Sequence, residues 1–216
     1  VAFVDAMFAE HLQRAPAEGD GGSPLRHVVL IGDGDVPHDV KYEDLLAAGS
    51  TDVPEEPEEE DPVVLMYTGG TTGLPKGVLL DQRAEMLNLY HVAAVQSFDP
   101  SQVYLHQTPL FHAASMAGVL GITSSGAVNV TIPLFDPAGV MDLIEAHGVT
   151  QTVMVPTMIA MVLNHPEFRP ERLASLRLLT YGASPMPAAT LDKLMELYPD
   201  LEISQGYGLT ECSSVL

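Results

Sequence analysis

The sequence predicts an α/β protein with a mostly parallel sheet flanked by helices, and two observations carry this prediction. Short runs rich in β-branched residues alternate with amphipathic stretches that have helix start and stop residues, which is the pattern of consecutive βα units. The composition, with 46% hydrophobic and 18% charged residues among 216, is that of a soluble globular protein large enough to bury one substantial core.

The expected elements follow one another along the chain. The predicted strands are the short apolar runs at residues 1–4, 27–31, 63–68, 103–108, 128–132, 152–155, 176–180 and 202–204. The predicted helices are the amphipathic stretches at residues 5–14, 42–48, 83–97, 137–147, 156–163 and 188–198. The helix 137–147 has the clearest boundaries, because Asp136 is a capping residue, Pro137 suits the first helical position and Gly148 suits the end.

An acidic, proline-rich stretch interrupts this alternation at residues 54–62. In "VPEEPEEEDP" like charges repel and no apolar area can be buried, which predicts an extended, solvated linker or exposed loop. A functional acidic tail or a metal trap is the less favoured interpretation, since sequential carboxylates on an extended chain do not converge on one ion.

The bulk properties exclude several classes of partner. A formal charge of −20 should repel nucleic acid and anionic lipid, so neither is expected. No apolar run approaches the roughly 20 residues of a transmembrane helix, and no secretory signal pattern opens the chain. The lone Cys212 excludes an internal disulfide and fits a reducing compartment, so we expect a cytoplasmic protein, with a homodimer left open.

The stretch "MYTGGTTGLPKGV", residues 66–78, has the residue types of a phosphate-binding loop. It does not match the P-loop G-x-x-x-x-G-K-[ST], because Pro75 and Gly77 stand where glycine and a hydroxyl residue are required. What remains is a flexible loop of glycines and threonines with one cation, Lys76, whose backbone N–H groups and hydroxyls could meet phosphate oxygens. A plain glycine-rich hairpin between two strands is the alternative.

At this point the sequence resembles a known family. "YTGGTTGLPKG" is similar to the loop Y-T-S-G-T-T-G-x-P-K-G of the adenylate-forming enzymes, which include acyl-CoA synthetases, the adenylation domains of peptide synthetases and firefly luciferase; Gly69 takes the usual serine position. "TPLFHAASM", "YGASP" and "QGYGLTE" resemble three further family segments in the right order. The chain is therefore identified as a member of this superfamily.

The resemblance implies a two-step reaction that uses ATP, Mg²⁺ and coenzyme A. A carboxylate attacks the α-phosphorus of ATP to give an acyl-adenylate and pyrophosphate, and the thiol of coenzyme A then displaces AMP. Because "PLFH" is more typical of fatty and other acyl-CoA ligases than of peptide synthetases, we expect an acyl-CoA synthetase acting on a small carboxylic acid, with a fatty acid favoured.

The resemblance also implies site residues. Those implied to surround the β- and γ-phosphates are Thr68, Gly69, Gly70, Thr71, Thr72, Gly73 and Lys76. Those implied to hold the rest of the nucleotide are Gly182, Ala183 and Ser184 as the adenine wall, Gly206, Tyr207 and Gly208 with the Tyr207 ring against adenine, and Thr210 on the α-phosphate. Glu211 is implied to hold Mg²⁺, and the implied catalytic set is Lys76, His112, Thr210 and Glu211.

Three residue types keep a plainer alternative. His112 is implied to orient or gate the carboxylate, but a lone histidine after "LF" is otherwise a core-edge residue. Cys212 invites a nucleophile interpretation, yet we favour a packing thiol. The methionines of "VMVPTMIAMVL" and "GASPMP" could line an acyl pocket, but core packing is the preferred interpretation.

The chain is expected to be a fragment of the large N-terminal AMP-binding domain. Residues 1–53 form leading βα units, 54–62 the acidic loop, and 63–216 the phosphate loop and adenine-site region. A complete family member continues to a ribose-binding aspartate, a hinge and a C-terminal domain with a catalytic lysine, so we expect the isolated fragment to be inactive. A ligase that loads a carrier protein and a non-catalytic nucleotide-binding module are the alternative functions, and a P-loop hydrolase is a distant further one.

Overall fold

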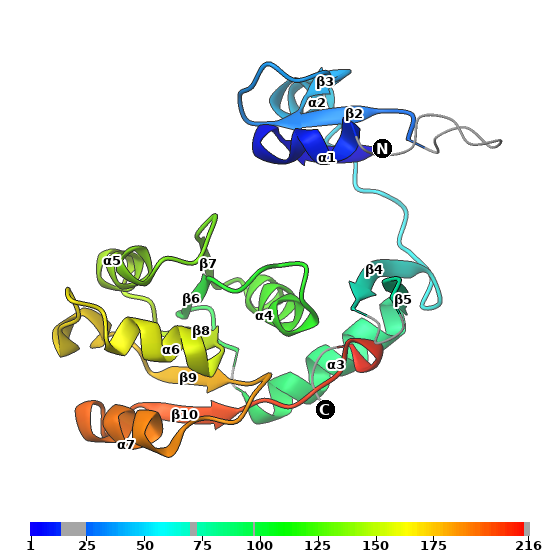
Figure 1. Ribbon diagram of the computed structural model, residues 1–216. Helices are drawn as coiled ribbons and strands as arrows, with labels where there is room; N and C mark the ends of the chain where they lie inside the picture. The colour runs from blue at the N-terminus through cyan, green and yellow to red at the C-terminus, as the bar shows by residue number, and fades with distance from the viewer. Residues whose placement is uncertain (14–24, 70–72, 97, 214–216) are drawn as a thin grey trace. The chain divides into compact units, whose positions relative to one another are not determined.

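The computed structural model describes residues 1–13, 25–69, 73–96 and 98–213 (Figure 1). The chain divides into two compact units, Val1–Glu56 and Pro57–Leu216, and each is described by itself. Among the described residues, no helix combines the length and the hydropathy needed to cross a bilayer. Gly70, Thr71 and Thr72, three of the predicted phosphate-loop residues, lie outside the described residues.

The first unit is a small parallel sheet with short helices. Its strands β1 (Ala2–Asp5), β2 (Val28–Ile31) and β3 (Val40–Lys41) pair in that order. The helix predicted at 5–14 begins as a 3₁₀ turn, η1 (Ala6–Phe8), and continues as α1 (Ala9–Gln13), because the Asp5 carboxylate accepts the Met7 N–H and caps the tighter turn. Helix α2 (Tyr42–Ala48) has its predicted bounds. The two-residue β3 was not predicted, since so short a run has no period.

The second unit contains a five-stranded parallel sheet in the order β10-β9-β8-β6-β7, which confirms the predicted fold class (Figure 1). Its strands are β6 (Val103–His106), β7 (Val128–Thr131), β8 (Gln151–Met154), β9 (Leu178–Tyr181) and β10 (Glu202–Gln205). Its helices are α4 (Ala113–Ser124), α5 (Pro137–His147), α6 (Pro156–Leu163) and α7 (Ala188–Leu197), with 3₁₀ turns η2 (Pro170–Leu173) and η3 (Thr210–Cys212).

The core of this unit joins the sheet to α5, α6 and α7. Leu105 at the centre of β6 and Ile144 on α5 are fully buried in it. The preferred interpretation of the methionines is confirmed for Met154, which is buried, and for Met158 and Met186, which pack against the same cluster. It is wrong for Met161 of the same stretch, which is 52% exposed because it lies outside the buried face of α6. Helix α5 begins at Pro137, where the Asp136 carboxylate accepts the Gly139 N–H, and ends at Gly148 in the left-handed conformation, as predicted.

A second part of this unit is an antiparallel hairpin followed by a long helix. Strand β4 (Pro62–Thr68) pairs with β5 (Lys76–Asp81), and Asp81 caps α3 (Gln82–Val95) by accepting the Ala84 N–H at 2.7 Å. The acidic stretch before β4 is exposed, as predicted. It also has a structural role, because the carbonyls of Glu59 and Asp61 accept N–H groups from the first turn of α3.

Two elements of the second unit were missed by the sequence prediction, for different reasons. Strand β5 begins inside the stretch 66–78, which was assigned to the phosphate loop. The hairpin that we gave as the alternative is therefore present, and the described residues of the predicted loop lie at its open end. Helix α4 is rich in small residues and lacks an amphipathic period. Its Gly118 lets the buried Tyr104 ring approach, since a Cβ there would lie 2.7 Å from the Tyr104 hydroxyl.

Candidate functional site

Three of the predicted segments leave the five-stranded sheet at the same edge. The segment "QTPLFH" follows β6, "GASP" follows β9 and "GYGLTE" follows β10, and all five strands are parallel. The chain passes from β6 outward to β7 and then returns to β8 on the other side of β6, so the strand order reverses at β6. Ligands of open α/β sheets bind at the carboxyl ends of the strands beside such a reversal.

The segments after β9 and β10 touch closely. The Gly206 N–H donates to the Tyr181 carbonyl at 2.8 Å, and a Cβ added to Gly182 would lie 2.7 Å from the Gly206 carbonyl oxygen. Glycine is therefore required at position 182 for the two backbones to approach. The neighbouring Ala183 has a φ of +66°, a left-handed conformation that is rare for alanine, and strain of this kind gathers at binding sites.

The segment after β10 presents polar and aromatic side chains to solvent. Tyr207 is 68% exposed, Glu211 is exposed and Thr210 is partly buried. Thr210 and Glu211 belong to η3, which contacts β5, the strand that begins at Lys76. The structure thus brings the predicted α-phosphate and metal residues beside the strand that carries the predicted phosphate cation.

The described part of the predicted phosphate loop lies at the open end of the β4–β5 hairpin. Thr68 and Lys76 are directly opposite each other, and the Thr68 hydroxyl donates to the Lys76 carbonyl at 3.5 Å. The Lys76 side chain is exposed and makes no ion pair with any described residue, so its charge is free to meet an anion. The strand after Lys76, where a P-loop would open a helix, agrees with the exclusion of that motif.

His112 is the N-cap residue of α4 and its side chain is exposed. Its ring lies 4.6 Å from the ring of Phe111, which is 72% exposed. The alternative of a core-edge histidine is therefore wrong, because the side chains of both His112 and Phe111 are exposed. Cys212 is only partly buried, so the packing interpretation holds in a weaker form than predicted.

The candidate donors for Mg²⁺ are the Glu211 carboxylate and the neighbouring Thr210 hydroxyl. Within the described part of the chain no group of three or more histidine, cysteine, aspartate or glutamate side chains could hold a metal by itself. Mg²⁺ does not need such a cage, since it takes one or two protein carboxylates and fills its shell with phosphate oxygens and water. The single exposed carboxylate of Glu211 beside the hydroxyl of Thr210 fits that pattern.

Polar residues that the sequence prediction did not select support the end of β6. The His106 ring contacts the Asn129 side-chain oxygen at 2.7 Å, and burial lowers the pKa of His106 although this hydrogen bond opposes the shift. The Gln107 side chain contacts the Thr152 hydroxyl at 2.6 Å and donates to the Val153 carbonyl. The sequence pattern that could have identified these residues is the run of polar residues directly after an apolar strand, in front of "PLFH".

A second unpredicted pair lies on α3, facing η3. Glu85 and Asn88 are each only 6% exposed. Burial raises the pKa of Glu85, and a hydrogen bond with the Ser213 side chain partly opposes that shift. The signal in the sequence was their spacing, because Glu85, Asn88 and the buried Val92 share one face of a helix.

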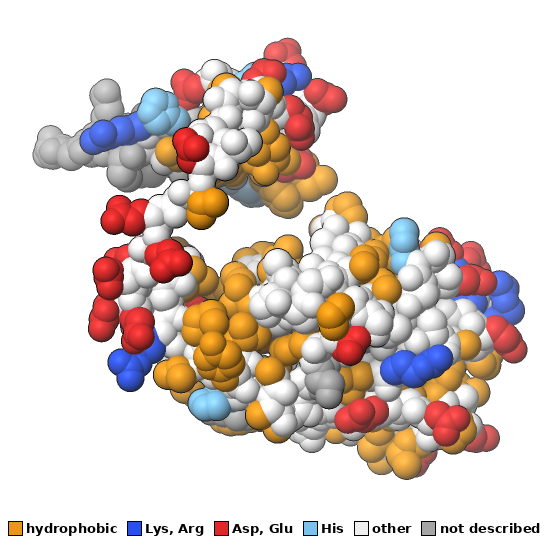
Figure 2. All heavy atoms as spheres, turned by 180° about the vertical axis from the view of Figure 1, so that it is seen from behind, with side chains coloured by type: hydrophobic (Ala, Val, Ile, Leu, Met, Phe, Trp, Pro, Cys, Tyr) orange, Lys and Arg blue, Asp and Glu red, His pale blue; other side chains and the backbone are white. Residues whose placement is uncertain are grey.

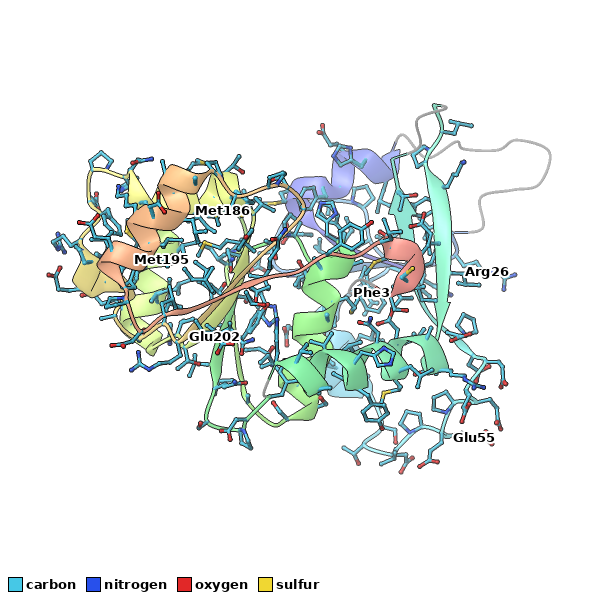
Figure 3. The ribbon with its side chains drawn as sticks, turned by 90° about the horizontal axis from the view of Figure 1, so that it is seen from below. Phe3, Arg26, Glu55, Met186, Met195 and Glu202 are labelled. Carbon is cyan, nitrogen blue, oxygen red and sulfur yellow. The ribbon has the colours of Figure 1, made fainter. Side chains whose placement is uncertain are left out.

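A groove lies elsewhere among the described residues, beside the edge strand β10. It is lined by Tyr181, Leu191, Met195, Ile203 and Gln205, among others. Figure 3 labels Met195 on α7 and Glu202 at the start of β10, the two elements that border it. Lys76, His112 and Glu211 do not line it, so we assign it no part in the candidate site.

Comparison with known proteins defines the class of the chain. The family model described as AMP-binding enzyme matches residues 2–216, and the chain therefore belongs to the AMP-binding enzyme family. Its relatives include AMP-forming CoA ligases, and the predicted family membership is confirmed.

Particular relatives are similar over part of their length. The chain is 34% identical over 183 residues to 4-coumarate–CoA ligase 3 of Oryza sativa subsp. japonica, which covers 82% of the chain and 33% of that protein. It is 35% identical over 155 residues to a feruloyl-CoA synthase of an Amycolatopsis species, covering 71% of the chain and 31% of that protein. The chain thus spans about a third of the length of these relatives.

A solved structure supports the fold. The anthranilate CoA ligase AuaEII, in complex with anthranoyl-AMP, superposes with a TM-score of 0.85 at 24% identity, covering 99% of this chain and 41% of that one. The α/β fold of an adenylate-forming N-terminal domain, predicted from the sequence, is therefore confirmed.

Proposed function

We propose that the protein activates a carboxylic acid with ATP to an acyl-adenylate and then transfers the acyl group to coenzyme A. The observation that carries this proposal is the convergence of "QTPLFH", "GASP" and "GYGLTE" at the carboxyl edge of one parallel sheet, next to the point where the strand order reverses. Membership in the AMP-binding enzyme family supports the use of ATP.

The proposed chemistry has two displacements. An oxygen of the acid forms a bond to the α-phosphorus while the bond to the bridging oxygen of pyrophosphate breaks. The thiol of coenzyme A then gives up its proton and attacks the acyl carbon, and AMP leaves with the bonding electrons. The first step moves charge between oxygens and the second moves it from the thiol sulfur to a phosphate oxygen of AMP, so the protein's main task is positioning and charge neutralisation.

The residues divide this task between the two parts of the second unit. Lys76 and the glycines and threonines around it meet the β- and γ-phosphates, while Thr210 donates to the α-phosphate. Glu211 would hold Mg²⁺, which supplies charge neutralisation on the phosphates when bound. Tyr207 offers an exposed ring to adenine, and the close approach at Gly182 supports a flat wall beside it. His112 orients the carboxylate.

The acid is either aliphatic or aromatic. We expected a fatty acid from the sequence, although "PLFH" itself favours coenzyme A as the acceptor and does not distinguish aliphatic from aromatic acids. The names of the two relatives, 4-coumarate–CoA ligase and feruloyl-CoA synthase, favour an aromatic acid instead.

A cytoplasmic location, the division at residues 53 and 62, and a homodimer stay predictions.

Two other functions can be distinguished from the proposed one. A ligase that loads a carrier protein would use the same adenylation half, and only the acceptor would differ. A non-catalytic nucleotide-binding module is less favoured, because Lys76, Thr210 and Glu211 are all present and accessible to ligand. A domain released from catalysis has no physical need to keep a phosphate cation and a metal carboxylate together.

The test is ATP–pyrophosphate exchange by the protein in its full natural length, with acids from acetate to long-chain fatty acids, benzoate and 4-coumarate. We expect exchange with one class of acid, and a loss of about a hundredfold or more in Lys76→Ala and Glu211→Ala, since each removes a charge that contacts the reacting phosphates.

Matched controls use residues of the same type away from the site. Lys41→Ala in the first unit, where Lys41 pairs with Asp33, and Glu196→Ala on the exposed face of α7 should leave exchange unchanged. A folded protein that shows no exchange with any acid in the panel would contradict the proposal. Exchange without transfer to coenzyme A would favour the carrier-loading ligase.

A further inference from the structure

The most unusual buried group of the second unit is the carboxyl group of Glu85. It lies on the inner face of α3, 6% exposed, at a position whose helical neighbour Val92 is buried and apolar. A leucine or alanine there would bury apolar surface without removing a carboxyl group from water. A carboxyl group kept at such a position therefore needs a partner that makes use of it.

Its partner is the segment that carries the proposed metal residue. The Glu85 side chain is hydrogen-bonded to the Ser213 side chain, and Ser213 is itself only 4% exposed. One turn further along α3, the Asn88 side chain donates to the Cys212 carbonyl at 3.5 Å. Both contacts end on the residues that directly follow Glu211.

The backbone of that segment has little support of its own. The turn η3 has three residues, held by the Cys212 N–H donating to Leu209 at 3.0 Å and the Ser213 N–H donating to Thr210 at 3.2 Å. Ser213 ends the turn in the left-handed conformation, with a φ of +55°, which is costly for serine. Such a conformation persists only where the surroundings hold it in place.

We infer that Glu85 and Asn88 are positioning residues for the active site, which hold η3 so that Thr210 and Glu211 face the phosphates bound along β5. This inference rests on the proposed function. It explains why polar groups occupy the buried face of α3: the helix begins at the end of β5, so one rigid element fixes both the strand of Lys76 and the turn of Glu211. Neither residue is proposed to touch ATP or the metal.

The test compares two variants at one position. Glu85→Leu keeps the volume and removes the hydrogen-bonding group, whereas Glu85→Gln keeps an oxygen that can accept the Ser213 hydroxyl. The first readout is amide hydrogen exchange over residues 209–213 in the protein of full natural length, without ATP or metal. We expect Glu85→Leu to speed exchange at the Cys212 and Ser213 amides about tenfold, and Glu85→Gln to stay close to the wild-type protein.

The second readout is the Mg²⁺ concentration that gives half-maximal ATP–pyrophosphate exchange. Loss of a group that orients a metal ligand typically costs 10–100-fold in metal affinity, so we expect a rise of about tenfold in Glu85→Leu and in Ser213→Ala, with the KM for the acid unchanged. Because both changes break the same contact, the double variant should be no worse than either single variant. If Glu85→Leu does not fold, Ser213→Ala still tests the inference, since it breaks the same contact by removing only one hydroxyl.

The outcomes separate this inference from the proposed function. A wild-type protein without Mg²⁺-dependent exchange overturns the proposed function. A wild-type protein that exchanges, with variants whose residues 209–213 and Mg²⁺ requirement are unchanged, overturns the inference alone. Equal acceleration of amide exchange along all of α3 also overturns it, because Glu85 would then serve only the stability of its own helix. The exposed Glu196→Leu on α7 is the matched control and should change neither readout.

Discussion

The two parts of the second unit carry the candidate site in different ways. The centre of the five-stranded sheet is buried, with three of the four residues of β6 and three of the four residues of β8 inside the core. The hairpin of β4 and β5 has Met66 and Leu80 buried, while Val63, Leu65, Tyr67 and Leu79 on it are exposed. Figure 2 shows apolar side chains gathered over part of the surface of this unit. The sheet is thus held by its own core, and the hairpin is not.

The candidate site is therefore divided between a closely packed part and a part with less apolar support. The segments proposed to meet the adenine and the acid follow strands of a sheet whose centre is fixed by apolar burial. The proposed phosphate cation, Lys76, and the proposed metal carboxylate, Glu211, lie on a two-stranded ribbon and a three-residue turn. Two-stranded hairpins are marginal by themselves, and we therefore infer that α3 and its polar contacts fix this half of the candidate site.

The largest expected effect tests the packing side of this comparison. Leu105→Ala, at a fully buried position of β6, should lower the free energy of opening of the sheet by about 3–4 kcal/mol, because it removes apolar contacts and leaves a cavity. Leu79→Ala, at a 63% exposed position of β5, should change it by less than about 1 kcal/mol. Amide hydrogen exchange of β6 and β8 measures both, and equal effects would mean that the hairpin is covered by other structure.

The next effect concerns the contact between the segments after β9 and β10. Gly182→Ala places a methyl group 2.7 Å from the Gly206 carbonyl oxygen, and that oxygen cannot rotate away because it belongs to the backbone. The two segments must separate, and a displacement of this size should lower ATP–pyrophosphate exchange about a hundredfold.

A glycine in the hairpin provides the matched control for this substitution. At Gly69 an added Cβ meets no described atom within 4 Å, so Gly69→Ala should leave the contact between the segments after β9 and β10 intact. Amide hydrogen exchange of residues 181–183 and 205–208 should therefore accelerate in Gly182→Ala and stay unchanged in Gly69→Ala, and acceleration in both variants would contradict a local clash at Gly182.

Much of the sheet could be predicted because its elements are locally encoded. Helices α2, α5 and α6 have their predicted bounds. Prolines at the first turn mark the starts of α5 and α6, Asp136 also caps α5, and Gly49 and Gly148 mark the ends of α2 and α5 in the sequence. Helix α4 was not predicted, because its glycines serve contacts with Tyr104 and Phe98 that exist only in the folded state. Strand β5 was missed because its glycine-rich surroundings indicated a loop.

The candidate site shows the same limit. The motif residues of "GASP" and "GYGLTE" could be selected from the sequence, and the parallel strands explain why they meet. The spacing of Glu85 and Asn88 places them on one helix face with Val92, but their function could not be inferred from it, because the partner residue of Asn88, Cys212, is 124 residues away in the sequence. Tertiary contact, and no local pattern, gives Glu85 its partner.

A smaller effect follows from the buried histidine at the end of β6. Burial lowers the pKa of His106, so the folded protein prefers the neutral ring, while the unfolded chain takes up a proton near pH 6.5. Stability should therefore be constant above that pH and fall as the pH drops below it, by at most about 1.4 kcal/mol per pH unit. In His106→Gln this part of the slope should be absent in unfolding experiments between pH 7 and pH 5. An unchanged slope would show that other groups cause it.

The smallest expected effect concerns the strain at Ala183, on the closely packed side of the site. Its φ of +66° costs about 1 kcal/mol for alanine and almost nothing for glycine. Ala183→Gly therefore removes strain from the folded state, but it also raises the conformational entropy of the unfolded chain. We expect a net gain in unfolding free energy below about 1 kcal/mol, measured by urea denaturation. If the strained turn holds the adenine wall in position, the same variant should bind ATP two- to fivefold more weakly, because part of the binding free energy must then order the loop. A gain in stability with unchanged ATP affinity would instead show that the wall is fixed by Gly182 and its contact with Gly206 alone, with Ala183 carrying strain that binding does not use.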